Sequence, residues 1–311
     1  MLGATNLNVR RMAAAAALLT AGCAAQAPPA SRLPAPPNEY LAAGARAMEA
    51  TRAVVALGPR PAGSEAQQQQ QRVILERLQG LRCEIEEHDF TVSTPVGRRT
   101  MKNIVARFDG SSDRAVVVSG HYDTKLLKDF VGANDAGSST GLLLAFAEML
   151  DGRELADEVW ILFLDGEESF IQWTDEDHTY GSRRQAQSWV DNGQSQRVKA
   201  LINVDMIGDA DLRLMYESAS TPWLRDLVWD VAARLGYERA FPRSEPAYIA
   251  DDHVEFLERG FAALDLIDFD YGPGNRYWHT PEDTMDKLDA RSFAVILHVL
   301  VESLAELEKK P

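Results

Sequence analysis

The sequence predicts an α/β protein: a three-layer α/β/α single domain with a mixed sheet that is parallel at its centre. Continuous apolar runs of strand length indicate strands that helices bury on both faces. Stretches of helical residues separate these runs, and such alternation is typical of a sheet between two helical layers. A length of 311 residues suits one unit of this class, because α/β domains often reach about 250 residues or more.

The first half of the expected domain contains two helices and an antiparallel sheet edge. Residues 39–57 and 65–79 have helical patterns, and the turn-forming sequence GPRPAGS separates them. Residues 83–92 and 102–108 then alternate apolar and polar side chains, as half-buried strands do. We expect these two strands to pair with each other at one edge of the sheet.

The second half supplies the buried strands and the helices that cover them. The apolar runs that predict strands are residues 115–119, 159–164, 200–204 and 262–267. The stretches that predict helices are residues 140–150, 223–235 and 290–307. Continuous apolar runs of this kind, alternating with helical stretches, predict the parallel centre of the sheet.

The N-terminus has the pattern of an export signal. Arg10 and Arg11 precede an apolar run at 12–19 that is too short to span a membrane, and small residues then lead to Cys23. The residues around Cys23 resemble a bacterial lipobox, in which the cysteine carries lipid. Residues 24–37 contain five prolines and predict an extended segment. We therefore expect a signal peptide at 1–22, a lipid-anchored Pro/Ala-rich tether at 23–37 and a folded domain at 38–311.

Either reading of this N-terminus predicts an exported protein. Lipid on Cys23 places the protein at the periplasmic face of a bacterial membrane, as a lipoprotein with no other membrane contact. The alternative is a plain cleaved signal peptide and a soluble periplasmic or secreted protein.

Charge and cysteine content restrict the partners and the metal ligands. The chain has 32 Lys and Arg against 47 Asp and Glu, a net charge of −15, which opposes binding to nucleic acid. Its two cysteines are Cys23 and Cys83, so neither a disulfide framework nor a thiolate metal cage is expected. A metal ion would therefore be held by histidine and carboxylate groups.

Acidic residues and histidines gather where the expected strands end. Ligands of open α/β sheets bind beyond the carboxyl ends of the strands, so these side chains should share one rim. Histidine and carboxylate ligands with one free position are typical of catalytic zinc. The residues concerned are His121, Asp123, Asp165, Glu167, Glu168 and Asp205 at strand ends, Asp135 in the loop that opens the helix after the first of these strands, Asp251, Asp252 and His253 before the last strand, and His279 after it.

Two short spacings within this set suggest roles. His121 and Asp123 are two residues apart, so in extended chain they share a face, and Asp123 can hold the second imidazole nitrogen of His121. Glu167 and Glu168 are adjacent and point in different directions. One of them can bind a metal while the other moves protons beside it.

Longer motifs resemble those of zinc-dependent glutaminyl cyclases, which share their fold with the bacterial zinc aminopeptidases. The likeness runs from about Gly58 to Leu288, and DGEE, Trp173 and YGSR are its most specific part. The segments that carry it are HYDTK, FVGANDAGSSTG, FLDGEESFIQW, TYGSRR, VDMIGDAD, DDHVEFLERG and YWHTPED. The resemblance implies a zinc-dependent catalytic domain at 38–311 with a zinc aminopeptidase-like fold.

The resemblance also implies residue roles and a reaction. Asp135, Glu168 and His279 would bind one zinc, and Glu167 would be the proton shuttle, with Asp205 and Asp251 in a hydrogen-bond network behind it. Trp173 and Trp278 would line the substrate pocket. The implied reaction converts the N-terminal Gln of a peptide or protein to pyroglutamate and releases ammonia, with one Zn²⁺ per chain favoured.

A zinc aminopeptidase is the alternative enzyme. Such peptidases bind two metals, and His121 and Asp205 would hold the second ion, with Asp135 as the bridge. The sequences Asn134-Asp135 and HTPEDT (279–284) are closer to the peptidases, and residues 272–276 differ from the aromatic loop expected in animal cyclases. A zinc-bearing domain that binds without turnover is a further alternative.

The remaining histidines and tryptophans are interpreted as structural. His178 lies in a polar loop and is expected to be exposed, whereas His253 follows two aspartates and is a candidate for a group behind the metal ligands. His88 and His298 are assigned to surface or core packing. The tryptophans assigned to core or helix packing are Trp160, Trp189, Trp223 and Trp229.

Overall fold

The computed structural model describes residues 33–310 and contains a six-stranded mixed sheet in the order β1-β2-β4-β3-β5-β6. Strands β3, β4, β5 and β6 are mutually parallel, while β1 and β2 form the antiparallel edge. The strands are β1 (Glu84–Thr94), β2 (Gly97–Phe108), β3 (Ala115–His121), β4 (Glu158–Leu164), β5 (Val198–Asp205) and β6 (Ala263–Ile267). The expected mixed sheet with a parallel centre is confirmed.

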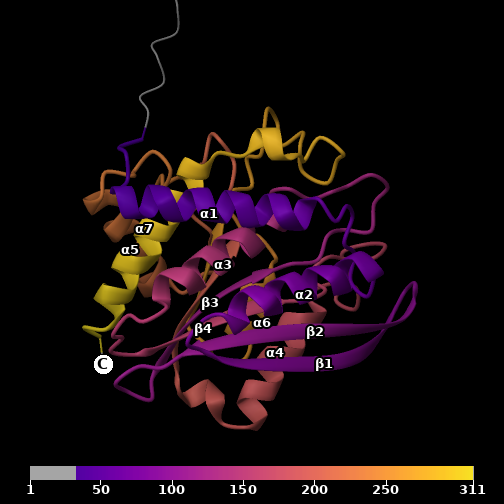
Figure 1. Cartoon of the computed structure of the whole chain (residues 1–311), viewed down its shortest axis with the longest axis horizontal. Coiled ribbons are helices and arrows are strands. Elements are labelled where there is room, and N and C mark those ends of the chain that lie inside the picture. The colour runs from indigo at the N-terminus through magenta and orange to yellow at the C-terminus, as the bar shows by residue number, and fades with distance from the viewer. Residues whose placement is uncertain (1–32, 311) are drawn as a thin grey trace, which may run out of the picture. The chain divides into compact units, whose positions relative to one another are not determined.

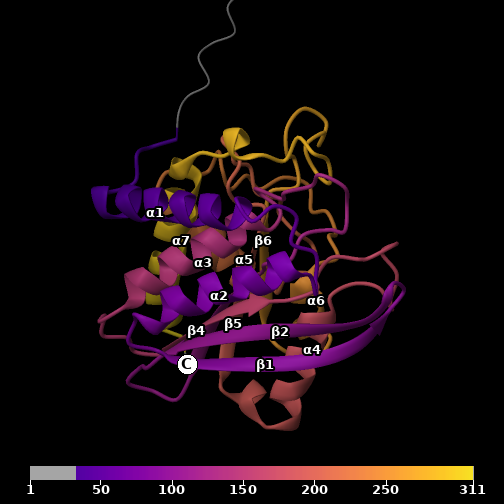
Figure 2. The same cartoon turned by 45° about the vertical axis from the view of Figure 1, so that its right-hand side comes forward.

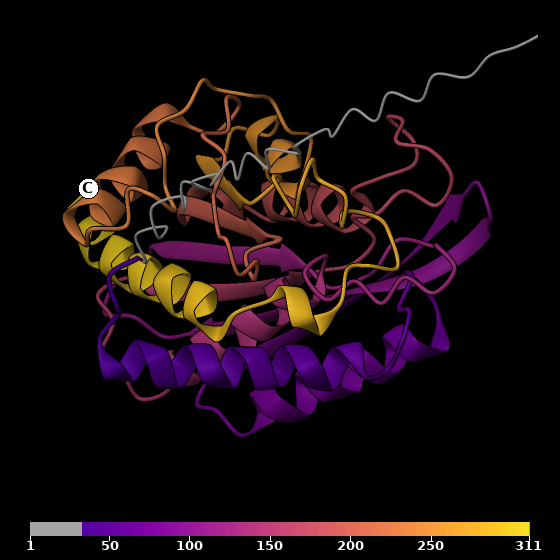
Figure 3. The same ribbon diagram turned by 90° about the horizontal axis from the view of Figure 1, so that it is seen from above.

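Helices cover both faces of the sheet and complete the three layers (Figure 3). The first layer holds α1 (Asn38–Val55), α2 (Glu65–Gln79), α3 (Gly137–Leu150) and α7 (Ala290–Leu307). The opposite layer holds α4 (Tyr180–Asp191) and α6 (Asp252–Leu257), and α5 (Pro222–Arg234) packs beside α7 and β6. Figures 1 and 2 show the β1–β2 hairpin running along one edge of the sheet.

Two apolar clusters fill the spaces between the layers. The larger cluster joins α1, α3 and α7 to one face of the sheet, and it includes Phe146 and Phe293. The smaller cluster joins α4 and α6 to the other face through Trp160, Trp189 and Phe256. The central strands are therefore buried on both sides, which explains their continuous apolar sequences.

Strand register brings the chemical groups to one edge of the sheet. In the parallel ladders, His121 at the end of β3 pairs with Leu164 of β4, directly before the segment Asp165–Glu168. Asp205 at the end of β5 pairs with Ile267 of β6. Four carboxyl ends thus meet at the same rim, as expected for ligand sites of open α/β sheets.

Helices α4 and α6 have no counterpart among the sequence expectations. The α4 sequence YGSRRQAQSWVD is mostly polar and has few large apolar residues, and α6 has only six residues, so neither contains an apolar stretch long enough to predict a helix. Most of the expected signal peptide and tether, including Cys23, lies outside the described residues. Residues 33–37 form neither helix nor strand. Between residues 33 and 310, no helix is long and apolar enough to cross a membrane.

Candidate active site

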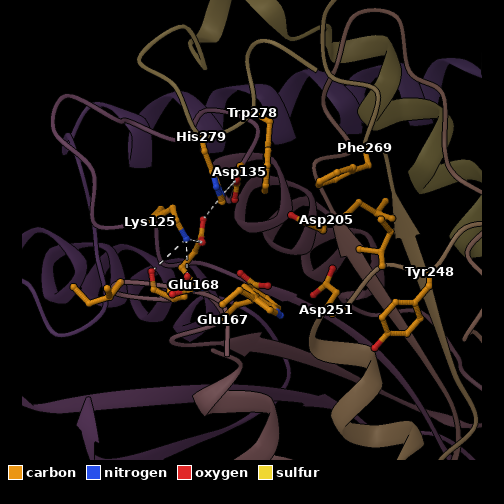
Figure 4. Close-up of a pocket in the computed structure, with 17 residues that line it drawn as sticks. Lys125, Asp135, Glu167, Glu168, Asp205, Tyr248, Asp251, Phe269, Trp278 and His279 are labelled. Carbon is orange, nitrogen blue, oxygen red and sulfur yellow. Dashed lines mark hydrogen bonds and ion pairs between the residues drawn. The ribbon is translucent and has the colours of Figure 1, made fainter. Parts of the chain in front are cut away.

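Asp135, Glu168 and His279 form a compact group at the rim (Figure 4). The imidazole Nε2 of His279 lies 2.9 Å from Oε1 of Glu168 and 3.2 Å from Oδ2 of Asp135. All three side chains are at least half-buried, and their ligand atoms lie within 4.8 Å of one another. One nitrogen and two carboxylate oxygens at this spacing suit a metal ion with a position left free for substrate.

His121, Asp135 and Asp205 form a second group of the same kind, with Asp135 in common. Nε2 of His121 lies 3.1 Å from Oδ1 of Asp205 and 3.4 Å from Oδ1 of Asp135. All three side chains are buried. Asp135 is therefore the residue that the two groups share, and its bridging of two metal ions, which the aminopeptidase alternative requires, stays a prediction.

The electrostatics of both groups arise from buried acids packed against histidines. Burial acts most strongly on His279 and lowers its pKa, yet hydrogen bonds with Asp135 and Glu168 raise that pKa to about 9 overall. Burial likewise favours the protonated form of Asp135, but the two histidines hold its pKa below the ordinary value. Burial raises the pKa of Asp205 to about 7, against the opposing effect of His121. Buried carboxylates converge here, and a bound cation would neutralise them.

Asp123 connects the end of β3 to the acidic pair. Its carboxylate accepts hydrogen bonds from the backbone N–H of Glu167 at 3.1 Å and of Glu168 at 3.4 Å. Its Oδ1 also lies 3.6 Å from Nδ1 of His121, which is the ring nitrogen that the sequence spacing predicted Asp123 would hold. The main hydrogen bonds of Asp123 thus fix the backbone of the acidic pair.

Glycine 166 allows the tight bend that carries the acidic pair past the end of β4. Its φ of +69° lies in the left-handed region, and a Cβ there would come within 2.7 Å of the Met101 sulfur. The bend lets Glu168 face His279 while Glu167 lines the cavity beside it.

Glu167 is buried and has the properties of a proton carrier. Burial is the largest cause of its raised pKa, and the negative charges of Glu168 and Asp251 raise it further, while His121 opposes them. A carboxyl group whose pKa moves up toward neutrality can exchange protons at physiological pH. Both oxygens of the adjacent Glu168 are already engaged, because Oε1 lies 2.9 Å from Nε2 of His279 and Oε2 lies 3.0 Å from Nζ of Lys125.

Asp205 and Asp251 both line the cavity with Glu167, but their hydrogen bonds run elsewhere. Asp205 pairs with His121, and Asp251 caps α6 by accepting the backbone N–H of Asp252. Oδ2 of Asp251 is buried with no hydrogen-bond partner in the described part of the chain. The structure therefore brings these acids together around the cavity, and within residues 33–310 no direct hydrogen bond joins Glu167, Asp205 and Asp251 to one another.

A cavity of about 410 Å³ opens beside these groups (Figure 4). Trp173 and Trp278, the two tryptophans assigned to the pocket from the sequence, both line it. Trp278 stacks on His279 at 4.0 Å between ring centroids and meets Phe269 edge to face at 4.9 Å. The cavity thus combines a polar end, which holds the acids, with aromatic walls, as small-ligand sites commonly do.

Lys125 is a site residue that the sequence reasoning did not assign. Its ammonium group lies 3.0 Å from Oε2 of Glu168 and donates to Oγ of Ser169 at 2.8 Å. The side chain is mostly buried and lines the cavity. Its place in the motif HYDTK, directly after the strand end, is the signal that could have identified it.

Two further residues hold the loop that presents Asp135. Asp283 accepts the backbone N–H of Asn134 at 2.8 Å and of Asp135 at 3.1 Å. Arg60, fully buried, donates to the carbonyl oxygens of Val131 at 2.9 Å and Gly132 at 3.1 Å. The sequence placed Arg60 in a plain turn and Asp283 in a peptidase-like motif, so both positioning roles were missed.

The structure corrects the sequence interpretation of His178 and places His253 more closely. His178 is half-buried rather than exposed, because its ring stacks on Trp173 at 4.2 Å. His253 is buried behind the cavity, with Nε2 3.2 Å from Oε2 of Glu217. Trp160, Trp189 and Trp229 are buried in the core as expected, whereas Trp223 is 40% exposed on α5.

Comparisons with known proteins agree on one family. The model of peptidase family M28 matches residues 103–304. A glutaminyl-peptide cyclotransferase of Boiga irregularis is 32% identical over 269 residues, covering 73% of this chain and 72% of that protein. The crystal structure of an Acidobacteriales bacterium glutaminyl cyclase is similar, with a TM-score of 0.82, 34% identity, and coverage of 92% of this chain and 100% of that one.

A peptidase structure shares the same fold at lower identity. A Zn-dependent exopeptidase from Parabacteroides distasonis gives a TM-score of 0.76 with 22% identity, covering 84% of this chain and 97% of that one. The zinc aminopeptidase-like fold expected from the sequence is thereby confirmed.

Proposed function

The chain belongs to peptidase family M28, and we propose that it is a glutaminyl cyclase, which converts the N-terminal Gln of peptides or proteins to pyroglutamate and releases ammonia. The observation that carries this proposal is Glu167, a buried acid placed beside a His/carboxylate metal group in a cavity with aromatic walls. Similarity to glutaminyl cyclases at 32–34% identity supports it.

We further propose Zn²⁺ as the cofactor, held by Asp135, Glu168 and His279. The donor set of one imidazole and two carboxylates fits zinc, and it leaves a position for substrate. When bound, the ion supplies a Lewis acid that polarises the side-chain carbonyl of the substrate Gln. Lys125 and Asp283 keep Glu168 and Asp135 in the orientation that this donor set requires.

Glu167 carries out the proton transfers in the proposed reaction. The substrate's α-amine attacks its own side-chain carbonyl carbon, forming the ring C–N bond, while the C–N bond to the side-chain nitrogen breaks. Glu167 accepts the proton that the α-amine loses and delivers it to the departing nitrogen, which leaves as ammonia. The nucleophile is part of the substrate, so the aromatic walls formed by Trp173 and Trp278 serve to exclude water.

The test is a product analysis with the zinc-loaded protein and peptides that begin with Gln. We expect mass spectrometry to show the loss of one ammonia with the remaining chain intact. Release of a free N-terminal amino acid from unblocked peptides, with no cyclised product, would instead identify a peptidase.

One observation favours an aminopeptidase as the second candidate function. His121, Asp135 and Asp205 form the additional group that a two-metal peptidase would need. In that case Glu167 would take a proton from water attacking the peptide carbonyl. The product analysis above separates the two activities, because only hydrolysis frees an amino acid.

We also propose that the protein acts outside the cytoplasm on peptide and protein N-termini. The basic pair at Arg10 and Arg11, the short apolar run and Cys23 support export with a lipid anchor. A net charge of −15 supports substrates other than nucleic acid.

A further inference from the structure

Trp173 stacks on a residue that is not part of the cavity wall. The indole ring and the imidazole of His178 lie 4.2 Å apart between centroids, with an interplanar angle of 4°. Trp173 lines the cavity and is 37% exposed, while His178 does not line it. Trp173 lies in the segment 171–176, whose residues are all exposed, so few neighbours within this segment pack against the indole.

Hydrogen bonds fix the orientation of the His178 ring. Nδ1 of His178 lies 2.8 Å from Oγ1 of Thr179, and that hydroxyl donates to Oε1 of Glu255 at 2.9 Å. The Thr179 hydroxyl has only one hydrogen, and it donates that hydrogen in the hydrogen bond to the Glu255 carboxylate. The Thr179 oxygen must therefore accept, and Nδ1 of His178 must carry a proton and donate it.

The far end of this chain of hydrogen bonds is firmly held. Glu255 is buried on α6 and accepts hydrogen bonds from Arg183 on α4 at 3.0 Å and from Arg259 at 2.9 Å. The backbone N–H of Thr179 donates to the carbonyl oxygen of Glu167 at 2.8 Å. The same short segment is thus tied to two helices and to the acidic pair.

We infer that His178 is a positioning residue that holds the indole of Trp173 as a wall of the substrate cavity. Without a stacked partner, the indole on its exposed loop would sample several rotamers. Binding of the substrate would then have to immobilise it, which lowers affinity. The inference rests on the proposed function for its activity readout. It goes beyond that function because it assigns to His178 the role of holding Trp173 in place.

Two substitutions separate stacking from hydrogen bonding. His178→Asn keeps a donor near the position of Nδ1 and removes the flat ring, whereas His178→Phe keeps a flat ring and removes the donor. With a Gln-initiated peptide, we expect His178→Asn to raise KM about 3- to 10-fold with kcat changed less than about 2-fold, the range for loss of one aromatic pair. His178→Phe should raise KM less than His178→Asn does, because it keeps the stacked ring and loses only the hydrogen bond that orients it.

His88→Asn is the matched control. His88 is also a half-buried histidine with two side-chain partners, Glu86 and Gln185, but it lies on β1 and does not line the cavity. It should leave KM and kcat unchanged. An equal rise in KM for both His178 variants, or none for His178→Asn, would overturn the inference.

A second measurement tests the stack without any activity. In NMR spectra of the full chain, the ring protons of His178, assigned by their loss in His178→Asn, should be shifted upfield by the indole and should move back in Trp173→Leu. Unshifted ring protons in the wild type would overturn the inference. If the wild type shows this shift and fails to cyclise Gln peptides, the proposed function fails and the support of Trp173 by His178 stands.

Discussion

The ammonium group of Lys125 lies 3.0 Å from Oε2 of Glu168 and so engages one oxygen of that carboxylate. The other oxygen, Oε1, faces His279 at 2.9 Å. One oxygen of the Glu168 carboxylate is therefore held by the ammonium group of Lys125, and the other faces the candidate metal position. Groups that hold a metal ligand in this way set both its direction and its basicity.

Lys125→Met should lower kcat/KM by about 10-fold or more, because Glu168 loses the hydrogen bond that orients it. Removal of a positive charge would by itself favour cation binding, so the zinc content must be measured in parallel. Zinc retained with activity lost would identify an orienting role. Lys199→Met is the control, since Lys199 is also buried in an ion pair, with Asp157 at 2.8 Å, and does not line the cavity. Full activity in Lys125→Met would contradict this role.

Glu167 and Glu168 should respond differently to substitution. Glu168→Ala should reduce the zinc content, because it removes a carboxylate whose Oε1 lies in the candidate metal group. Glu167→Gln should retain the metal and lose about 100-fold or more in rate, the usual value of a positioned acid/base group. Elemental analysis beside steady-state kinetics checks both expectations. Zinc kept in Glu168→Ala and lost in Glu167→Gln would mean that the two roles are reversed.

The sequence identified the groups that lie at strand ends, because the geometry of a parallel sheet places those ends together. His121 and Asp205 are the last residues of β3 and β5, and two residues separate the acidic pair from the end of β4, so their convergence needs no knowledge of long loops. Asp135 and His279 lie in loops, and the family resemblance was needed to assign them.

Residues that act through loop geometry could not be found in the same way. Arg60 and Asp283 reach the loop of Asp135 from turns about 75 residues before it and about 148 residues after it, and nothing in their local sequence reports that contact. His178 was misjudged because a polar neighbourhood predicts exposure, whereas the path of the loop brings its ring onto Trp173. Helix α4 was missed because its sequence is mostly polar, and its buried apolar side chains are limited to Tyr180, Ala186 and Trp189.

The pH dependence of kcat/KM should report the charges around Glu167. Glu167 must be deprotonated to accept a proton, so activity should fall as the pH drops through its pKa. The negative charge of Asp251 raises that pKa, so Asp251→Asn should move the acid limb of the profile to lower pH. Asn also caps helices well, so α6 should be preserved. An acid limb that moves to higher pH would contradict the assignment of Glu167 as the base.

The anchor at Cys23 can be tested by fractionation. In a bacterial host that processes lipoproteins, we expect the full chain in the membrane fraction and Cys23→Ser in a soluble fraction or as an uncleaved precursor. The physical reason is that the proposed anchor is a lipid on this cysteine, and the substitution would remove the thiol that carries it. Wild-type protein that is released as freely as Cys23→Ser would indicate a plain cleaved signal peptide instead.

The number of zinc ions depends on what His121 does between Asp135 and Asp205. Burial opposes a charged imidazole, yet the charge of Asp205 and hydrogen bonds with its carboxylate neighbours raise the pKa of His121 well above the ordinary value. A protonated His121 places its positive charge where a second cation would lie. A second metal ion, about 3.5 to 4 Å from the first ion, would need His121, Asp135 and Asp205 as its ligands. We therefore expect about one tightly held zinc per chain and little loss of zinc in His121→Ala, measured by elemental analysis after dialysis. Two zinc ions per chain, with activity that follows the second, would contradict this expectation and favour the aminopeptidase.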